Sequence, residues 1–232
     1  MKKLLLVLAV SLGTAHAQTE EVVKSAFGGG EGVNGEVLAM AVQTDGKIII
    51  GGRFSAVNGV PRNNIARLNA DGTLDRSFAD KMEMGVNGQV NAVVLPPAGG
   101  VVVGGQFTQL GNVEAMNLGR YNADGTPDKS FGTASGQELG ANGVVFALTA
   151  QPDGKIVVGG NFSTVFGQPR RGVARLNTDN TLDGPINPQA AISGPVRALV
   201  ATADDSFIAG GQFTVLNQIS RSLFKLAAPV TE

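Results

Sequence analysis

The sequence predicts an all-β fold, a β-propeller built from four repeated sheets, and three observations lead to this prediction. Glycine is unusually common, with 33 of 232 residues, while aromatic residues make up only 5%. Helical periodicity is not sustained over 11 residues in any part of the chain after the first segment. One unit of about 53 residues recurs four times, and four antiparallel strands in a repeat of this length are typical of a propeller blade.

The first segment, residues 1–17, has the pattern of a secretory signal peptide. Lys2 and Lys3 precede an apolar run, and Ala15-His16-Ala17 provides a small-residue cleavage site. The run is too short to span a bilayer, which needs about 20 residues. We therefore expect cleavage after Ala17, leaving residues 18–232 as a single domain exported to the periplasm, the cell surface or the medium.

The repeat is defined by three features in fixed register. A strand-like segment starts with valine and has alanine two residues later, and a Gly-Gly pair follows 14 residues after that valine. A basic residue comes 15 or 16 positions after the first glycine of the pair, and in three copies an aspartate follows eight residues further on. The valines are Val37, Val90, Val145 and Val196; the first glycines are Gly51, Gly104, Gly159 and Gly210; the basic residues are Arg67, Arg120, Arg175 and Lys225.

Each unit predicts four short strands. In the first copy they are Val37–Gln43, Ile48–Phe54, Asn64–Asn69 and Thr73–Phe78. Asp45-Gly46 and Asp71-Gly72 are the residues that tight hairpin turns prefer. The second strand is a β-branched run, which predicts burial on both faces. An isolated blade cannot bury the apolar side chains on both of its faces, so neighbouring blades are expected to cover them.

The phase of the repeat predicts how the ring closes. Ser25-Ala26-Phe27 matches the fourth strand of a blade, and the last copy ends after its third strand. We therefore expect residues 22–28 to complete the last blade and close a four-bladed ring within one chain. The alternative is a larger ring assembled from two chains, so that the protein is either a monomeric ring or a homodimer.

The composition excludes several kinds of chemistry. The chain has no cysteine and a single histidine, His16, inside the predicted signal, so disulfides and the Ser-His-Asp and Cys-His arrangements are excluded from the mature protein. Charge is sparse and the net charge is −1, which argues against nucleic-acid binding. An enzyme would have to use loop carboxylates. The carboxylates outside the repeated turns are Glu31, Asp80, Glu83, Glu114 and Glu138.

Two repeated polar patterns have both a structural and a functional interpretation. The segment from Asn69 to Asp75 is similar to the middle of a calcium loop, but Arg67 and Phe78 occupy the outer ligand positions, so we predict no metal and no cofactor. Arg67 and Asp75 lie eight residues apart around a tight turn. That spacing predicts an ion pair across the hairpin, with an anion-binding ring as the alternative.

The loops that vary between copies predict the binding face. Loops after the second strand and loops between repeats are expected on one face of the ring, opposite the tight turns. They span Ser55–Asn63, Thr108–Asn117, Ser163–Gly172, Thr214–Arg221, Ala79–Gly88, Gly132–Gly143 and Gly184–Gly194. The candidate binding residues in them are Arg62, Met82, Met84, Met116, Phe166, Arg170, Arg171 and Arg221. The structural alternative is that Met and Phe fill gaps between blades while Arg is solvated.

The runs Gln43–Phe54 and Asn64–Phe78 resemble the delta-60 repeat of bacterial exported proteins, and residues 90–131 and 145–183 match the same pattern. The resemblance implies a propeller-like fold and carries over no catalytic residues. The fourth copy departs from the pattern, since Lys225-Leu226-Ala227 lacks the tight turn. We expect a non-catalytic binding or scaffold module for a protein or carbohydrate partner. The alternatives are a secreted carbohydrate-active or other hydrolase and a purely structural cell-envelope protein.

Overall fold

The computed structural model describes residues 30–82, 85–132, 139–184, 192, 194–215 and 219–226. Four three-stranded antiparallel sheets follow one another along this part of the chain. The first sheet contains β1 (Glu36–Val42), β2 (Ile48–Arg53) and β5 (Ile65–Leu68), and the second contains β6 (Gln89–Val94), β7 (Val101–Gln106) and β10 (Leu118–Tyr121). The third contains β11 (Val144–Ala150), β12 (Ile156–Asn161) and β15 (Val173–Leu176), and the fourth β16 (Val196–Ala201), β17 (Phe207–Val215) and β18 (Ile219–Leu226).

The β-branched runs form the middle strand of each sheet, as their composition predicts. Val101, Val102 and Val103 are fully buried in β7, with hydrogen-bonded strands on both sides. The first strand of every sheet carries a bulge. In the first sheet it lies between Val37 and Ala39, and in the other sheets it lies between the equivalent valine and alanine. The bulge faces the Gly-Gly pair, where a side chain would collide with the backbone of the first strand.

The predicted fourth strand over 73–78 is wrong. After the tight turn only single bridges form, Leu68 to Leu74 in the first repeat and Tyr121 to Pro127 in the second. The chain then enters α2 (Arg76–Ala79), because the carboxylate of Asp75 accepts a hydrogen bond from the Ser77 amide and caps a helical turn. Phe78 is thereby fully buried, so the segment acts as a plug and not as a strand.

Short hairpins follow the middle strands of the first three sheets. They are β3 (Ala56–Val57) with β4 (Val60–Pro61), β8 (Gln109–Leu110) with β9 (Val113–Glu114), and β13 (Thr164–Val165) with β14 (Gln168–Pro169). Each hairpin bridges to the segment that enters the first strand of its own sheet, for example Val57 to Val33. The loops after the second strands and the connections between repeats therefore share one face, as predicted.

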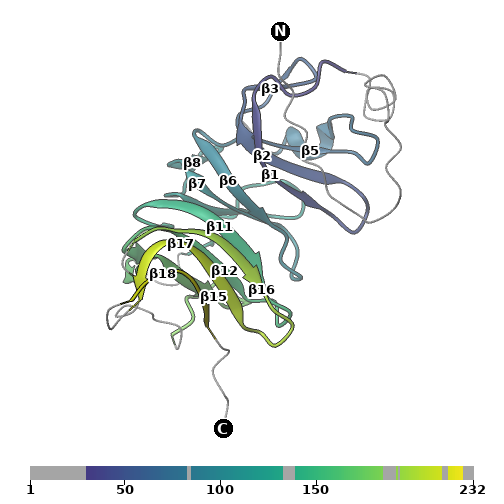
Figure 1. The fold of residues 1–232 in the computed structure, drawn as a ribbon. Coiled ribbons are helices and arrows are strands. Elements are labelled where there is room, and N and C mark those ends of the chain that lie inside the picture. Colours follow the sequence, from purple (N-terminus) through teal and green to yellow (C-terminus); the bar gives the residue numbers. More distant parts are fainter. Residues whose placement is uncertain are drawn as a thin grey trace, which may run out of the picture.

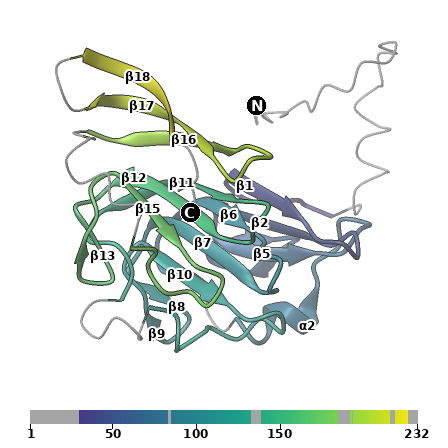
Figure 2. The same ribbon diagram turned by 90° about the horizontal axis from the view of Figure 1, so that it is seen from below.

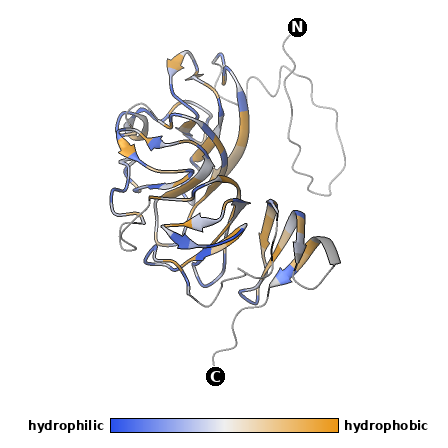
Figure 3. Cartoon of the chain, turned by 90° about the vertical axis from the view of Figure 1, so that its left-hand side faces the viewer, coloured by the Kyte–Doolittle hydropathy of each residue, from blue (hydrophilic) through white to orange (hydrophobic). Residues whose placement is uncertain are grey.

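Consecutive sheets pack through their first strands, so that β1 contacts β6, β6 contacts β11 and β11 contacts β16. In the first three repeats, the first glycine of the Gly-Gly pair lies against the valine that starts the next repeat. A Cβ added to Gly51 would be 2.5 Å from Cγ1 of Val90, and one added to Gly104 would be 2.4 Å from Cγ1 of Val145. Separate apolar clusters fill the interfaces between consecutive sheets. Hydrophobic residues run along the strands (Figure 3).

The four sheets are arranged in chain order, with the first and the last at opposite ends of the molecule (Figure 1). The view from below shows the sheet β16–β18 forming an edge of the structure (Figure 2). The predicted closing segment, residues 22–28, lies outside the described residues, as does the predicted signal peptide at 1–17.

Candidate binding face

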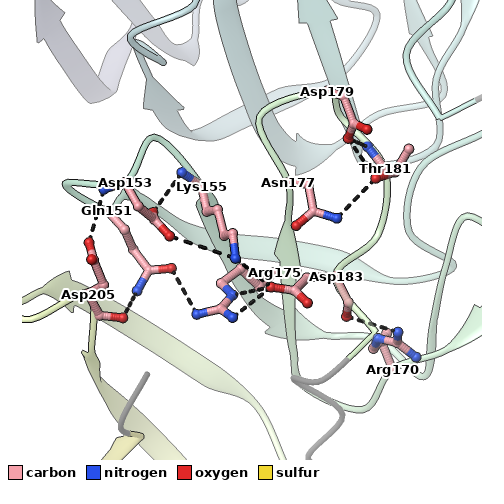
Figure 4. Close-up of polar contacts among 10 residues, drawn as sticks. All are labelled: Gln151, Asp153, Lys155, Arg170, Arg175, Asn177, Asp179, Thr181, Asp183 and Asp205. Atoms are coloured by element: carbon pink, nitrogen blue, oxygen red, sulfur yellow. Dashed lines mark hydrogen bonds and ion pairs between the residues drawn. The ribbon is translucent and has the colours of Figure 1, made fainter. Parts of the chain in front are cut away.

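The tight-turn face carries ion pairs that form within individual repeats. Nε of Arg67 lies 2.9 Å from a carboxylate oxygen of Asp75, and Arg175 lies 2.6 Å from Asp183. These contacts confirm the predicted ion pairs. Arg175 is fully buried, and Lys155 reaches the same carboxylate at 3.3 Å (Figure 4).

The same cluster joins the third sheet to the fourth. The amide of Gln151 donates to the backbone carbonyl of Asp205, and the backbone N–H of Asp153 donates to the Asp205 carboxylate at 2.9 Å (Figure 4). The pKa of Asp75 shows the balance of forces in the equivalent first cluster. Burial raises this pKa, but hydrogen bonds from Lys47 and Ser77 and the charge of Arg67 lower it by a larger amount. The pKa therefore lies well below its usual value. These groups are therefore committed to the fold.

Among the described residues, the opposite, loop-bearing face has an open hollow at equivalent places in the first, second and third repeats. The first has a volume of about 510 Å³ and is lined by Asn34, Arg53, Ser55, Asn63 and Asn87 among others. The second, about 250 Å³, is lined by Asn87, Gln106, Thr108 and Asn117 among others. The third, about 450 Å³, is lined by Asn142, Asn161, Ser163 and Arg171 among others.

A repeated asparagine builds the wall of each hollow. In the first repeat, the side-chain oxygen of Asn34 accepts hydrogen bonds from the backbone amides of Ser55 and Ala56, both at 2.9 Å. Its amide group donates to the Ser55 hydroxyl at 2.9 Å. Asn87 and Asn142 make the same three contacts in the next two repeats. These asparagines fix the loop backbone and leave the neighbouring positions free to vary.

Two positions around each hollow change chemistry between repeats. The last residue of the middle strand is Arg53, Gln106 or Asn161. The residue that ends the hairpin loop is Asn63, Met116 or Arg171. Arg53 is exposed, and its guanidinium lies 3.4 Å from Glu36 and donates to Gln89. The three hollows therefore have one frame and three different linings.

The structure corrects three of the predicted binding residues. Met82 and Phe166 are buried in the core, with 1% and 0% exposure, and Phe166 packs edge-to-face on Phe131. Arg170 is also buried and donates to the backbone carbonyls of Pro169 and Asp183. Burial lowers the pKa of Arg170, and the charge of Asp183 partly offsets this. Met82 and Phe166 belong to apolar clusters shared by two consecutive sheets, whereas Arg170 is held by carbonyls of its own repeat.

The other predicted residues fall into three groups. Met116 and Arg171 are exposed, and Arg171 lines the third hollow. Arg62 is mostly covered, and its guanidinium donates to the Pro61 carbonyl and lies 3.3 Å from Asp80. Met84 lies outside the described residues, and for Arg221 the structure describes only its place in β18, opposite Phe213.

Sequence reasoning missed the variable residues at the ends of the middle strands. The signal was present, because Arg53, Gln106 and Asn161 each follow directly after a Gly-Gly pair. A position that changes chemistry inside an otherwise constant frame is a candidate for recognition. The predicted strand Ile48–Phe54 includes this position.

The turn that resembles part of a calcium loop uses its oxygens internally. A carboxylate oxygen of Asp71 accepts hydrogen bonds from the amide and the hydroxyl of Thr73, at 2.9 and 2.6 Å. In the second repeat, the backbone and hydroxyl hydrogen bonds from Thr126 lower the pKa of Asp124 to about 2. Among the described residues, three or more His, Cys, Asp or Glu side chains do not gather anywhere in a metal-binding arrangement.

A family model matches parts of three of the four repeats. The model of a β-propeller domain of unknown function, DUF5122, matches residues 43–78, 99–131 and 151–184. The matched segments begin near the turn before each middle strand and end at the plug. No curated protein matches the sequence at a significant level. The described part of the chain contains no helix long and apolar enough to cross a membrane.

Solved structures share the fold at low sequence identity. The WD40 β-propeller domain of Doa1 is 13% identical, with a TM-score of 0.51, and the match covers 84% of this chain and 52% of that one. Virginiamycin B lyase from Staphylococcus aureus is 13% identical, with a TM-score of 0.44 and coverage of 86% and 59%. A protein of unknown function from Bacteroides caccae is 10% identical, with a TM-score of 0.46 and coverage of 83% and 63%. The family model and the WD40 domain support a β-propeller fold. The chain spans about half to two thirds of the length of the three structures.

Proposed function

We propose that this β-propeller chain is a non-catalytic binding module that presents the three hollows of its loop face to a partner. One observation carries the proposal. Asn34, Asn87 and Asn142 hold the same frame three times, while the residues around each frame differ in charge and polarity. Rigid scaffolds that vary only their loops are typical of binding proteins.

The linings favour a carbohydrate over a protein partner. Amide and hydroxyl side chains dominate each hollow. Asn34, Asn87 and Asn142 are bonded within the frame, and the other lining amides, such as those of Asn63, Gln106 and Asn161, suit sugar hydroxyl groups because both groups donate and accept hydrogen bonds. Apolar anchors of the kind that dominate protein interfaces are scarce there, since the lining phenylalanines Phe54, Phe107 and Phe162 are buried. Arg171 gives the third hollow a positive group suited to an acidic sugar, whereas Arg53 in the first hollow is paired with Glu36.

A binding role fits the hollows better than hydrolysis does. Glycoside hydrolysis uses a pair of carboxylates on either side of the scissile bond. None of the described residues that line the three hollows carries a carboxylate. The proposed place of action is outside the cytoplasm, and the signal-peptide pattern of residues 1–17 supports this.

A glycan array tests the proposal, with a pull-down from the exported fraction as its protein arm. Arg171→Ala and Gln106→Ala should each weaken binding of the captured glycan at least tenfold without changing the melting temperature. Arg76→Ala is the matched control, because Arg76 is exposed in α2 and does not line a hollow. Unchanged binding by both hollow variants would refute this face as the binding site.

A further inference from the structure

The first strand of the first sheet and the outer side of the last sheet each leave apolar side chains uncovered, while Ile50 and Leu68 beside the first strand are buried. On the first sheet the uncovered face is apolar: Val37 is 36% exposed, Met40 60% and Val42 68%. The equivalent valines in the other repeats, Val90, Val145 and Val196, are fully buried against the preceding sheet. The first sheet therefore presents the packing side chains of an inter-sheet interface with nothing from the described chain covering them.

The last sheet presents the opposite half of that interface. Leu223 is 64% exposed, whereas its equivalents Ile65, Leu118 and Val173 have 0%, 1% and 0% exposure. Gly210 is only partly buried, although Gly51, Gly104 and Gly159 are buried. Each of those three glycines receives a valine from the following repeat and, three residues later, a second apolar side chain such as Leu148 or Leu199.

The two uncovered faces are complementary, because they are the two halves of the contact that joins consecutive repeats. Val37 and Met40 occupy the positions that contact the first glycine of a preceding sheet, and Gly210 is the one such glycine in the described chain without a following repeat. The two faces lie at opposite ends of the molecule (Figure 1). They are therefore placed to meet a different copy of the chain.

We infer that two copies of this chain close one ring, with β1 of each copy packing on β17 and β18 of the other. A two-fold axis makes both contacts equivalent, so that both uncovered faces of each copy are buried at once. The size of the chain relative to a known propeller supports this inference. The match to the WD40 domain covers 84% of this chain but only 52% of that chain. The new interfaces would repeat the inter-sheet contact already present three times.

Cysteine cross-linking tests this arrangement directly, because the chain has no cysteine of its own. In the existing interface, a Cβ added to Gly51 would lie 3.2 Å from Cβ of Val90. Disulfides have Cβ–Cβ distances of about 3.5–4.5 Å, so a small shift allows the bond. Val37→Cys and Gly210→Cys are made as separate proteins and then mixed under mild oxidation.

The mixture should give a covalent dimer on a non-reducing gel, and each variant alone should not. A dimer from either variant alone would show a different pairing and would overturn the inference. The double variant Val37→Cys/Gly210→Cys should give a dimer as well. If it gives an oxidised monomer instead, the ring closes within one chain and the inference is wrong.

Sedimentation of the full chain provides a second measurement that needs no disulfide. The wild type should sediment at twice the monomer mass, and Met40→Glu or Leu223→Glu should raise the dimer dissociation constant at least a hundredfold. Met116→Glu is the matched control, because Met116 is 42% exposed on the loop face, and it should stay dimeric. A wild-type monomer at all concentrations would overturn the inference.

Discussion

Replacing Gly51 with alanine tests how closely neighbouring sheets approach. The added Cβ would lie 2.5 Å from Cγ1 of Val90 and 3.0 Å from Cγ2 of Val93. Val90 cannot move freely, because it is fully buried, and the partly buried Val93 packs against the same apolar cluster. Overpacking of this kind costs about 1–3 kcal/mol, partly offset by about 0.4–1 kcal/mol from the stiffer unfolded chain. We expect a net loss of roughly 1–2 kcal/mol.

Chemical denaturation of purified variants measures this loss. The loss corresponds to a fall in melting temperature of roughly 2–8 °C for a chain of this length. Val90→Ala removes the atom that collides, so the double variant should be less destabilised than the sum of the two single variants by at least about 0.5 kcal/mol. Gly184→Ala is the control, since nothing lies within 4 Å of its added Cβ.

A Gly51→Ala variant as stable as the wild type would refute this reasoning. The two sheets would then not be in the close contact that the structure shows. Simple additivity of Gly51→Ala and Val90→Ala would also refute it, because the collision predicts coupling between these two sites.

Three further predictions concern the core, the ion pairs and metal binding. Phe54→Ala should destabilise the fold by about 3–5 kcal/mol, measured by denaturation, because Phe54 is 6% exposed; a loss below about 1 kcal/mol would place it outside the core. Burial raises the pKa of Asp75, but its contacts with Lys47, Ser77 and Arg67 lower it by more, so the pKa is lowered overall. Its ionised form therefore stabilises the fold above its unfolded pKa of about 4, and stability should fall as the pH drops through the folded pKa; Asp75→Asn should flatten this dependence in acid unfolding curves, and an unchanged slope would count against it. Adding a chelator should leave the melting temperature unchanged, because Asp71 is bonded to Thr73; a fall in melting temperature would reveal a bound cation.

The sequence predicted those features that depend on contacts within one repeat. The Arg67–Asp75 and Arg175–Asp183 pairs form across a single turn, so their spacing was enough to place them. The shared face of the variable loops followed from strand alternation alone. The prediction of a fourth strand is wrong because Asp75 caps a helical turn. The segment is too short for its hydrophobic periodicity to distinguish a strand from a helix.

The burial of loop residues could not be predicted from one repeat. Met82, Phe166 and Arg170 lie in loops of variable sequence, yet each is buried. The burial of Met82 and Phe166 depends on how consecutive sheets pack, and that geometry has no local sequence signal. Arg170 is covered by the folding of its own loop against the Pro169 and Asp183 carbonyls. Arg171, next to Arg170 in the chain, is exposed and lines a hollow. Adjacent residues of the same type in this loop therefore differ between buried and exposed.

The radial packing of neighbouring repeats is tested most directly by an internal cysteine pair. A Cβ at Gly104 would lie 3.0 Å from Cβ of Val145 in the next sheet, so Gly104→Cys/Val145→Cys should oxidise to a disulfide within one chain, detected by loss of free thiols and by mass. Val103→Cys/Val145→Cys should keep its thiols, because Val103 belongs to the apolar cluster on the other side of its sheet. Free thiols in the first variant, or equal oxidation of both, would contradict the packing described above.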